Sequence, residues 1–326
     1  MKRIDRIGLM TSGGDSPGMN AAIRAVVRTA MFHNLEVFGI YRGYEGLIDG
    51  QIEQLFSHSV SNIIQRGGTI LKTARSERFL TKEGRHQAWM NLLEHKIDAM
   101  VVIGGNGTFT GAKIFDEEYD FPVVGLPGTI DNDLFGTDAT IGYDTAINTV
   151  VGACDKIRDT ANAHDRLFFV EVMGRDAGFI ALRSGIAAGA EFILVPETTT
   201  YIDNIARLLK HDWRRNKTSG IVIVAEGDDM GGAYEVARKV KEKLPEMDTR
   251  VTVLGHIQRG GAPSAFDRVL ASTLGYAAVK ALLDGQRGVM AGIIDKEVVY
   301  TPFEKAIKHH KDINLQMLEM SRILAL

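Results

Sequence analysis

Short apolar runs, rich in β-branched residues, alternate with longer amphipathic stretches along nearly the whole chain. Most of the runs are continuous, which is typical of strands buried on both faces of a parallel sheet. The expected strands are residues 6–11, 36–40, 97–103, 122–126, 167–173, 192–195, 221–225 and 250–254. Helical patterns are expected between them, at residues 18–33, 107–116, 146–163, 177–189, 203–217, 232–244 and 265–283. This order predicts an α/β fold of Rossmann-like, doubly wound, mostly parallel sheets with helices on both faces.

Two segments of the chain show a weak internal similarity. Residues 8–15 (GLMTSGGD) and 169–178 (FVEVMGRDAG) both suggest a strand, a Gly-rich turn and a helix. Either two related halves or the general likeness of strand-to-helix turns would produce this similarity. Open α/β sheets bind ligands outside the carboxyl ends of their strands, so we expect both turns to face one cleft.

Composition narrows the possible function classes. The chain has 38 Lys and Arg against 41 Asp and Glu, a net charge of −3, whereas nucleic-acid binders usually carry a basic excess. Its one cysteine, Cys154, excludes an internal disulfide and favours a reducing compartment. No apolar run approaches the roughly 18 residues of a membrane helix, and the first strand pattern begins too close to Met1 for a signal peptide. We therefore expect a cytoplasmic protein with neither nucleic acid nor membrane as a partner.

Two glycine clusters indicate phosphate binding. Residues 11–20 (TSGGDSPGMN) and 101–111 (VVIGGNGTFTG) each take a strand through a Gly-rich turn into a helix. Backbone N–H groups at a helix start bind phosphate well. The second cluster is not a P-loop, because no Gly-Lys-Ser/Thr follows, and it misses the dinucleotide fingerprint by one residue. Each cluster alone also fits an ordinary tight turn, but the two together favour a nucleotide polyphosphate.

A third cluster, residues 127–133 (PGTIDND), follows an apolar run and so lies at the carboxyl end of a strand. Asp131 and Asp133 are two residues apart and share a face in extended chain. A carboxylate at this place can take a proton from a hydroxyl nucleophile. Asn-Asp clusters are also ordinary turn formers, so the motif by itself leaves both interpretations open.

Arginines near the expected strand ends form a fourth group. Arg166 and Arg175 flank one expected strand, and Arg75 precedes a serine. Arg250 begins the expected strand 250–254, which is followed by the motif at residues 256–261 (HIQRGG). The last motif suggests an anion pocket, because the guanidinium fork matches phosphate oxygens. For any single arginine a surface ion pair is the alternative. The 9 histidines show no spacing typical of zinc ligands.

In combination these motifs resemble the bacterial ATP-dependent 6-phosphofructokinases. The likeness runs from Ile7 to near the C-terminus. It rests on TSGGD at 11–15, PGTIDND at 127–133, MGR at 173–175, AEG at 225–227 and GHIQRGG at 255–261.

The resemblance implies a fold, a reaction and an assembly. The fold is two Rossmann-like domains: an ATP-binding domain of residues 1–138 plus 256–304, and a fructose 6-phosphate-binding domain of residues 139–255 plus 305–326. The reaction is the phosphorylation of D-fructose 6-phosphate to fructose 1,6-bisphosphate in glycolysis, with ATP as co-substrate, Mg²⁺ as cofactor and ADP as product. The assembly is a homotetramer.

The resemblance also implies the site residues. Asp131 is the general base for the sugar 1-hydroxyl, with Thr129 and Asp133 beside it, while Arg175 steadies the moving phosphoryl group. The implied ATP-binding residues are Gly14, Arg75, Ser76, Gly105, Asn106, Gly107 and Thr108. The implied sugar-phosphate residues are Thr129, Ile130, Asp131, Arg166, Met173, Gly174, Arg175, Glu226, Arg250, His256, Ile257, Gln258 and Arg259. Among these, Glu226 accepts sugar hydroxyls, and Arg166 and Arg250 come from a neighbouring subunit.

A regulatory nucleotide site is implied in part. Matching residues are Arg24, Arg28, Arg158, Gly189, Ala190, Glu191, Arg215 and Lys217. Ser57, Asn62 and Ser219 match the family's positions but not their charge, which leaves the affinity for an effector open.

Asn106 departs from the family pattern, which has a magnesium-linked aspartate at this position. Mg²⁺ is usually held by one or two carboxylates together with phosphates and water, and asparagine keeps an oxygen but loses the charge. This motivates an alternative, a non-catalytic or weakly active sensor of sugar phosphate and nucleotide. A second alternative is a pyrophosphate-dependent enzyme. Members of that branch typically have an acidic side chain and a lysine at the positions of Gly107 and Gly128, so the two glycines favour ATP.

Overall fold

The computed structural model describes residues 3–213, 219–309 and 311–325. The chain divides into two compact units, each described here by itself. The first unit comprises Met1–Ile130, Leu134–Thr145 and Arg259–Lys311, and the second comprises Asp131–Asp133, Ala146–Gln258 and Asp312–Leu326. Compared with the domain boundaries expected from the sequence, the first unit gains residues 139–145 and 305–311 and lacks 131–133 and 256–258. Phe303 stacks on Phe109 with ring centroids 5.3 Å apart, which fastens the segment after it to the first unit.

The first unit contains a seven-stranded sheet in the order β11-β10-β5-β4-β1-β2-β3. Its five central strands are parallel, and β3 and β11 are antiparallel edges. The strands are β1 (Arg6–Thr11), β2 (Glu36–Ile40), β3 (Ile52–Leu55), β4 (Ala99–Gly104), β5 (Val123–Pro127), β10 (Val289–Ile294) and β11 (Glu297–Pro302).

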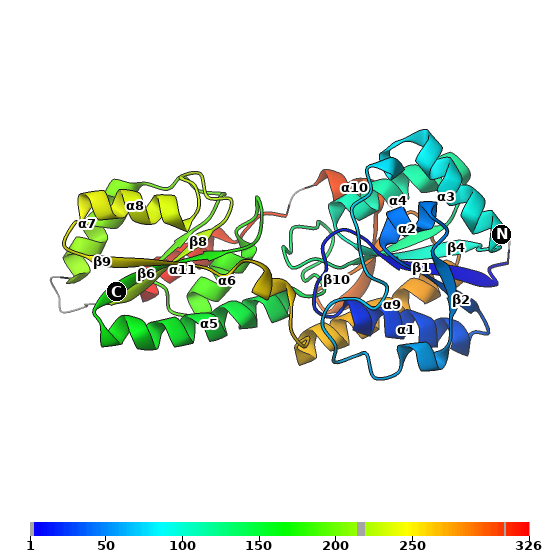
Figure 1. Ribbon diagram of the computed structural model, residues 1–326, viewed down its shortest axis with the longest axis horizontal. Helices are drawn as coiled ribbons and strands as arrows, with labels where there is room; N and C mark the ends of the chain where they lie inside the picture. The colour runs from blue at the N-terminus through cyan, green and yellow to red at the C-terminus, as the bar shows by residue number, and fades with distance from the viewer. Residues whose placement is uncertain (1–2, 214–218, 310, 326) are drawn as a thin grey trace. The chain divides into compact units, whose positions relative to one another are not determined.

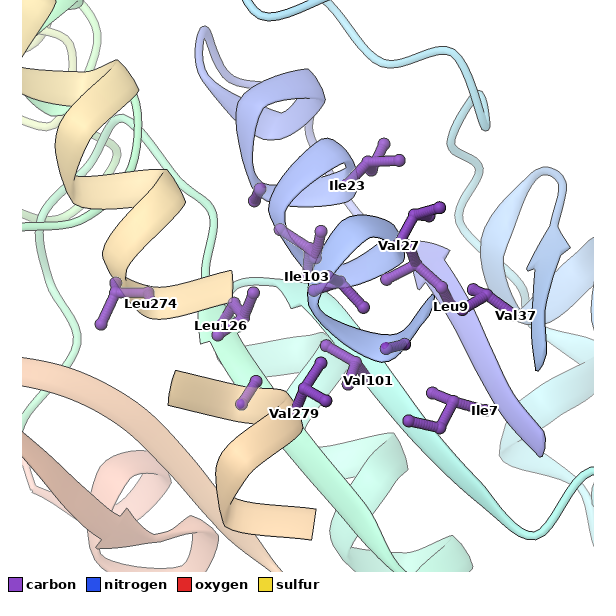
Figure 2. Close-up of a cluster of buried hydrophobic side chains, with 14 of the residues drawn as sticks. Ile7, Leu9, Ile23, Val27, Val37, Val101, Ile103, Leu126, Leu274 and Val279 are labelled. Atoms are coloured by element: carbon purple, nitrogen blue, oxygen red, sulfur yellow. The ribbon is translucent and has the colours of Figure 1, made fainter. Parts of the chain in front are cut away.

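Helices cover both faces of this sheet, with α1 and α9 on one face and α2, α3, α4 and α10 on the other (Figure 1). They are α1 (Met19–Phe32), α2 (Gly43–Ile48), α3 (Lys82–Glu94), α4 (Asn106–Tyr119), α9 (Ala265–Leu283) and α10 (Phe303–Lys308). Alternate residues of each strand supply the two cores, because successive side chains point to opposite faces. Leu9 and Val101 lie in the core beneath α1 and α9, which Figure 2 shows, and Met10 and Val102 lie in the other.

The second unit contains a four-stranded, fully parallel sheet in the order β7-β8-β6-β9. Its strands are β6 (Arg166–Val172), β7 (Phe192–Leu194), β8 (Gly220–Ala225) and β9 (Asp248–Val253). Helices α7 (Ile202–Trp213) and α8 (Ala233–Lys243) pack on one face. The other face carries α5 (Tyr143–Ala163), α6 (Phe179–Ala187) and α11 (Leu315–Leu324), as Figure 1 shows.

These sheets confirm the predicted fold class. All eight expected strands are present, and β1 and β2 begin and end at the expected residues. All seven expected helices are present, although residues 214–217 of the expected 203–217 lie outside the described residues. The sequence missed β3, β10, β11, α2, α3, α10 and α11, together with the short 3₁₀ helices η1 (Ser57–Val60), η2 (Arg78–Leu80) and η3 (Gly255–Arg259). Within the described part of the chain, every helix is too short or too polar to cross a bilayer.

Candidate active site

The first unit has a topological switch point between two neighbouring strands. β1 and β4 pair in parallel, but the helix after β1 (α1) covers one face and the helix after β4 (α4) covers the other. The loops that leave these strands therefore diverge, and in open α/β sheets the crevice between such loops binds ligands. Both glycine clusters predicted to bind a nucleotide lie at this point.

The two loops are joined by direct contacts. The Thr108 hydroxyl donates to the Ser12 carbonyl at 3.1 Å, and the Ser12 N–H donates to the Ile103 carbonyl at 3.0 Å. A Cβ at Gly104 would overlap Thr108 Oγ1 and lie 2.6 Å from the Ser12 carbonyl oxygen, so only glycine allows this approach. α4 then begins at Asn106, and the backbone N–H groups of a helix start point toward an anion placed there. The arrangement suits a phosphate chain.

Gly107 and Gly128, the two glycines that bear on the choice of phosphoryl donor, have different surroundings. A Cβ at Gly107 would have nothing within 4 Å, so a side chain there would project into open space beside the loop. A Cβ at Gly128 would lie 2.8 Å from Cγ2 of Ile103 and 3.0 Å from Cε of Met19. Gly128 is therefore required by core packing, and Gly107 is the more informative of the two about the phosphoryl donor.

Gly14 and Arg259 lie against each other in the first unit. A Cβ at Gly14 would be 2.7 Å from Nη1 of Arg259, and the same Nη1 donates to the Asp15 carbonyl at 3.1 Å. The family resemblance implies Gly14 for the nucleotide and Arg259 for the sugar phosphate. The structure brings the two residues together.

The third loop carries the candidate general base. Asp131 is buried, and its Oδ2 lies 3.7 Å from Nε of Arg175, whose side chain is 55% exposed. The Thr129 carbonyl accepts a hydrogen bond from the Thr140 hydroxyl at 2.6 Å. Ile130 is fully buried, so its side chain belongs to the core, while Asp133 is half-buried. The loop thus presents a carboxylate beside a guanidinium.

The turn from Met173 to Arg175 is shaped by Glu226. Its Oε1 accepts the backbone N–H groups of Gly174 at 3.2 Å and of Arg175 at 2.7 Å. Gly174 adopts φ +142°, and Arg175 has φ 53°, a conformation that L side chains rarely adopt. Glu226 therefore has a framework role in addition to any contact with sugar hydroxyls.

The motif at 255–261 divides into framework and exposed residues. Gln258 is fully buried; its Oε1 accepts the Met173 N–H at 3.2 Å, and its Nε2 donates to the Gly255 carbonyl at 3.0 Å. His256 and Ile257 are exposed. Gln258 thus braces the Met173 turn, and His256 is the side chain of this motif that can meet an anion from solvent.

Arg166 and Arg250 lie toward the amino ends of β6 and β9, in the sheet of the second unit. Nε of Arg166 donates to Oδ2 of Asp248 at 2.7 Å, and Arg250 donates to the other oxygen of that carboxylate. The hydrogen bond from Arg166, followed in effect by the charges of both arginines, lowers the pKa of Asp248. Arg166 begins β6, and Arg250 is the third residue of β9 and pairs opposite Phe168, so about 20 Å and about 13 Å of strand separate them from the carboxyl end of β6, after which Arg175 follows. They cannot join Arg175 in one pocket of a single chain.

The expected effector residues are distributed over both units. Arg24 and Arg28 lie one turn apart on α1, where burial, followed by the charge of Arg28, lowers the pKa of Arg24. In the second unit Arg158 donates to the carbonyls of Ala188 and Gly189, close to Ala190 and the buried Glu191. Arg215 and Lys217 lie outside the described residues.

The sequence missed several residues that hold these loops. The Thr73 hydroxyl donates to the Gly13 carbonyl at 2.7 Å, the Tyr44 hydroxyl donates to the Thr108 carbonyl at 2.7 Å, and the Ser76 hydroxyl donates to Glu45 at 2.5 Å. Tyr44 and Glu45 belong to α2, which has only six residues and gave no periodic signal. No local pattern in the sequence identifies these contacts.

Comparison with known proteins gives consistent matches. The family model described as Phosphofructokinase matches residues 6–282. The ATP-dependent 6-phosphofructokinase 2 of Bacteroides thetaiotaomicron is 56% identical over 326 residues, which is 100% of both chains. The ATP-dependent 6-phosphofructokinase 1 of Thermus thermophilus is 57% identical over 321 residues, 98% of this chain and 99% of the relative. The phosphofructokinase structure from Saccharomyces cerevisiae superposes with a TM-score of 0.89 at 37% identity, covering 98% of this chain and 48% of that one.

Proposed function

The chain belongs to the phosphofructokinase family, and we propose that it transfers the γ-phosphoryl group of ATP to the 1-hydroxyl of D-fructose 6-phosphate. The observation that carries this proposal is the pair of Asp131 and Arg175, 3.7 Å apart, in a chain so similar to ATP-dependent 6-phosphofructokinases over its full length. The glycolytic reaction follows from that activity. The same comparisons support catalysis over the non-catalytic alternative that Asn106 had motivated.

Phosphoryl transfer needs positioning, a proton acceptor and cations on the spreading negative charge. In our proposal Asp131 takes the proton of the 1-hydroxyl as that oxygen bonds to the γ-phosphorus. The bond from the γ-phosphorus to the bridging oxygen breaks, and ADP leaves with the electron pair. Arg175 stabilises the charge on the transferring group, and the buried position of Asp131 keeps water from competing for it.

ATP as the donor is supported by the open space at Gly107, which leaves room beside the loop for a nucleotide's further phosphate. We assign ATP to the residues of the first unit at the switch point, and the sugar phosphate to the second unit, which carries Met173, Glu226 and His256. The direct test is an assay of ADP release by the purified protein. We expect release only when fructose 6-phosphate is present; release at the same rate without the sugar would overturn the proposal.

Magnesium is proposed as the cofactor that accompanies ATP. The described residues contain no group of three His, Cys, Asp or Glu side chains able to enclose a metal. This donor set fits Mg²⁺ that is held mainly by phosphate oxygens and water, with at most one or two protein oxygens. Asn106, at the start of α4, would supply an oxygen through its amide, and bound Mg²⁺ would neutralise charge on the phosphates.

Asn106→Asp restores a negative charge beside the proposed metal. At about 4 Å and an effective dielectric of 20, a pair of unit charges interacts by roughly 4 kcal/mol, and desolvation offsets much of this. We expect the variant to need less Mg²⁺ for half-maximal rate, to turn over faster, or both, with unchanged affinity for the sugar. Magnesium titrations of both proteins at saturating substrates measure this. Superimposable curves would show that position 106 does not act through the metal.

The homotetramer is a proposal supported by the placement of Arg166 and Arg250. Their separation from Arg175 along the strands suits them to a neighbour's sugar-phosphate site rather than to the site of their own chain. A nucleotide effector is a further proposal that rests on Arg24, Arg28 and Arg158. The buried, unpaired Cys154 supports a reducing compartment such as the cytoplasm.

Shared sites predict complementation between inactive variants. Asp131→Ser lacks the base, and Arg166→Ala/Arg250→Ala lacks the cations donated to a neighbour. Co-expressed, the two chains should regain about a quarter of the wild-type activity, because that fraction of sites in a random mixture combines intact partners. The control pairs Asp131→Ser with a chain that carries all three changes, and it should stay inactive. No recovery in the first mixture would contradict a site shared between subunits.

A further inference from the structure

The segment that carries Arg75 is fastened to the first glycine loop on its N-terminal side. The Thr11 hydroxyl donates to the Lys72 carbonyl at 2.8 Å, and the Thr73 hydroxyl donates to the Gly13 carbonyl at 2.7 Å. After Thr73, the segment is next held at Ser76, whose hydroxyl donates a hydrogen bond to Glu45. Arg75, which is exposed, therefore lies on a short bridge between two held residues.

The hydroxyl of Ser76 makes its hydrogen bonds to neighbouring residues of the protein. It donates to Oε2 of Glu45 at 2.5 Å and accepts the N–H of Phe79 at 3.1 Å. A serine hydroxyl can donate one hydrogen bond, and here the carboxylate of Glu45 accepts it. The side chain of Ser76 is thus not available as a donor to a phosphate oxygen, and its evident task is to fix the chain next to Arg75.

Helix α2 presents Glu45 from a fixed position. The neighbouring residue, Tyr44, is buried, and its hydroxyl donates to the Thr108 carbonyl in the second glycine loop at 2.7 Å. The Tyr44 ring stacks on Phe79 with a centroid separation of 3.9 Å. One short helix therefore touches both the second glycine loop, through Tyr44, and the Arg75 segment, through Glu45.

Arg78 keeps the carboxylate of Glu45 oriented. Its Nη1 lies 2.7 Å from Oε1 of Glu45 and 2.8 Å from Oδ1 of Asp49. The hydrogen bond from Ser76, with further help from Arg78, lowers the pKa of Glu45, so the carboxylate is ionised at neutral pH. An ionised acceptor makes a shorter and stronger hydrogen bond than a neutral one.

We propose that Glu45 is a positioning residue for ATP: through the hydroxyl of Ser76 it holds Arg75 at the nucleotide site. This inference rests on the proposed function, because it gives Arg75 the nucleotide phosphates as its target. It makes Ser76 a support rather than a ligand. It also predicts that a carboxylate with no nucleotide contact of its own controls the affinity for ATP.

Four single variants test this proposal by steady-state kinetics and by calorimetric titration of ATP with Mg²⁺. Glu45→Leu and Ser76→Ala remove the contact, and Glu45→Gln keeps a neutral acceptor. Asp49→Asn is the matched control, since Asp49 lies on the same short stretch and pairs with the same Arg78 but does not touch Ser76. Thermal unfolding of each variant checks that it is folded.

We expect Glu45→Leu and Ser76→Ala to raise the KM and the Kd for ATP about tenfold, the lower end of the effect of a hydrogen bond to a charged group. The KM for fructose 6-phosphate should stay within about twofold, Glu45→Gln should show about a threefold rise, and Asp49→Asn should match wild type. The double variant Glu45→Leu/Ser76→Ala should be no worse than either single variant, because both remove one contact.

Two results would overturn the proposal: an unchanged affinity for ATP in Glu45→Leu, or an equal loss in Asp49→Asn. If Glu45→Leu does not fold, Ser76→Ala and Glu45→Gln decide the question in the same way. The failure of the proposed function is distinguishable, because it would appear in the wild-type protein as an absence of ATP-dependent phosphorylation. The calorimetric comparison between variants needs no activity and would still test the role of Glu45.

Discussion

Replacing Asp131 with serine is expected to lower turnover by about 10²–10⁴-fold, the usual effect of removing a general base. The carboxylate lies in the loop that follows β5, where it is buried and its Oδ2 is 3.7 Å from Nε of Arg175. Sugar-phosphate affinity should change little, because the proposed contact to the phosphate in the second unit comes from His256 rather than from Asp131. Steady-state turnover and a calorimetric titration of fructose 6-phosphate measure the two quantities separately.

The isosteric variant Asp131→Asn separates the loss of the base from a change of shape. It keeps the size of the side chain but cannot accept the proton, so its turnover should fall as far as that of Asp131→Ser. If either variant turns over within about tenfold of the wild-type rate, Asp131 is not the base.

Arg175→Ala is expected to lower turnover by roughly 10²–10³-fold, as when a donor to developing transition-state charge is removed. Arg175 has φ 53°, and Glu226 holds its backbone N–H at 2.7 Å. This strained, braced position aims a half-exposed guanidinium at the neighbourhood of Asp131. The effect should fall mainly on kcat, with a smaller rise in the KM for the sugar phosphate.

Arg183→Ala provides the matched control for Arg175→Ala. Arg183 is an exposed arginine of α6 in the same unit, so its removal changes the net charge equally without altering the Met173–Arg175 turn. It should retain wild-type turnover. Equal losses in both variants would point to a general charge effect and would remove Arg175 from the mechanism.

The sequence predicted those parts of the fold and the candidate site that depend on local pattern. Continuous apolar runs identified β1, β4 and β5, and because these strands are parallel neighbours, their following loops share one edge of the sheet. The sequence could not show that Gly104 permits the contact between two of those loops. That requirement arises only when the strands are paired.

The elements that the sequence missed have physical explanations. β10 and β11 form a hairpin whose two turn residues, Asp295 and Lys296, have φ 50° and 71°. Such turns usually contain glycine or asparagine, so Asp-Lys gave no turn signal. α3 has few apolar residues and is marked chiefly by its N-cap, where the Thr81 hydroxyl accepts the Gly84 N–H at 3.0 Å.

The sequence also could not predict side-chain contacts between segments that are distant along the chain. Asp248 between two arginines, and Glu45 with Ser76, join residues that only the folded chain brings together. Gln258, expected at the substrate, is completely buried and also braces the Met173 backbone, a contact that the sequence could not show. In each case tertiary packing, rather than local propensity, determines the role of the side chain.

The most direct test of the central claim compares two phosphoryl donors on the purified wild-type protein. Initial rates of fructose 1,6-bisphosphate formation are measured at saturating fructose 6-phosphate and Mg²⁺, once with ATP and once with pyrophosphate. The open position at Gly107 and the proposed roles of Asp131 and Arg175 predict product with ATP, and no rate above the enzyme-free blank with pyrophosphate. Faster product formation with pyrophosphate than with saturating ATP, or no product with either donor, would contradict the account.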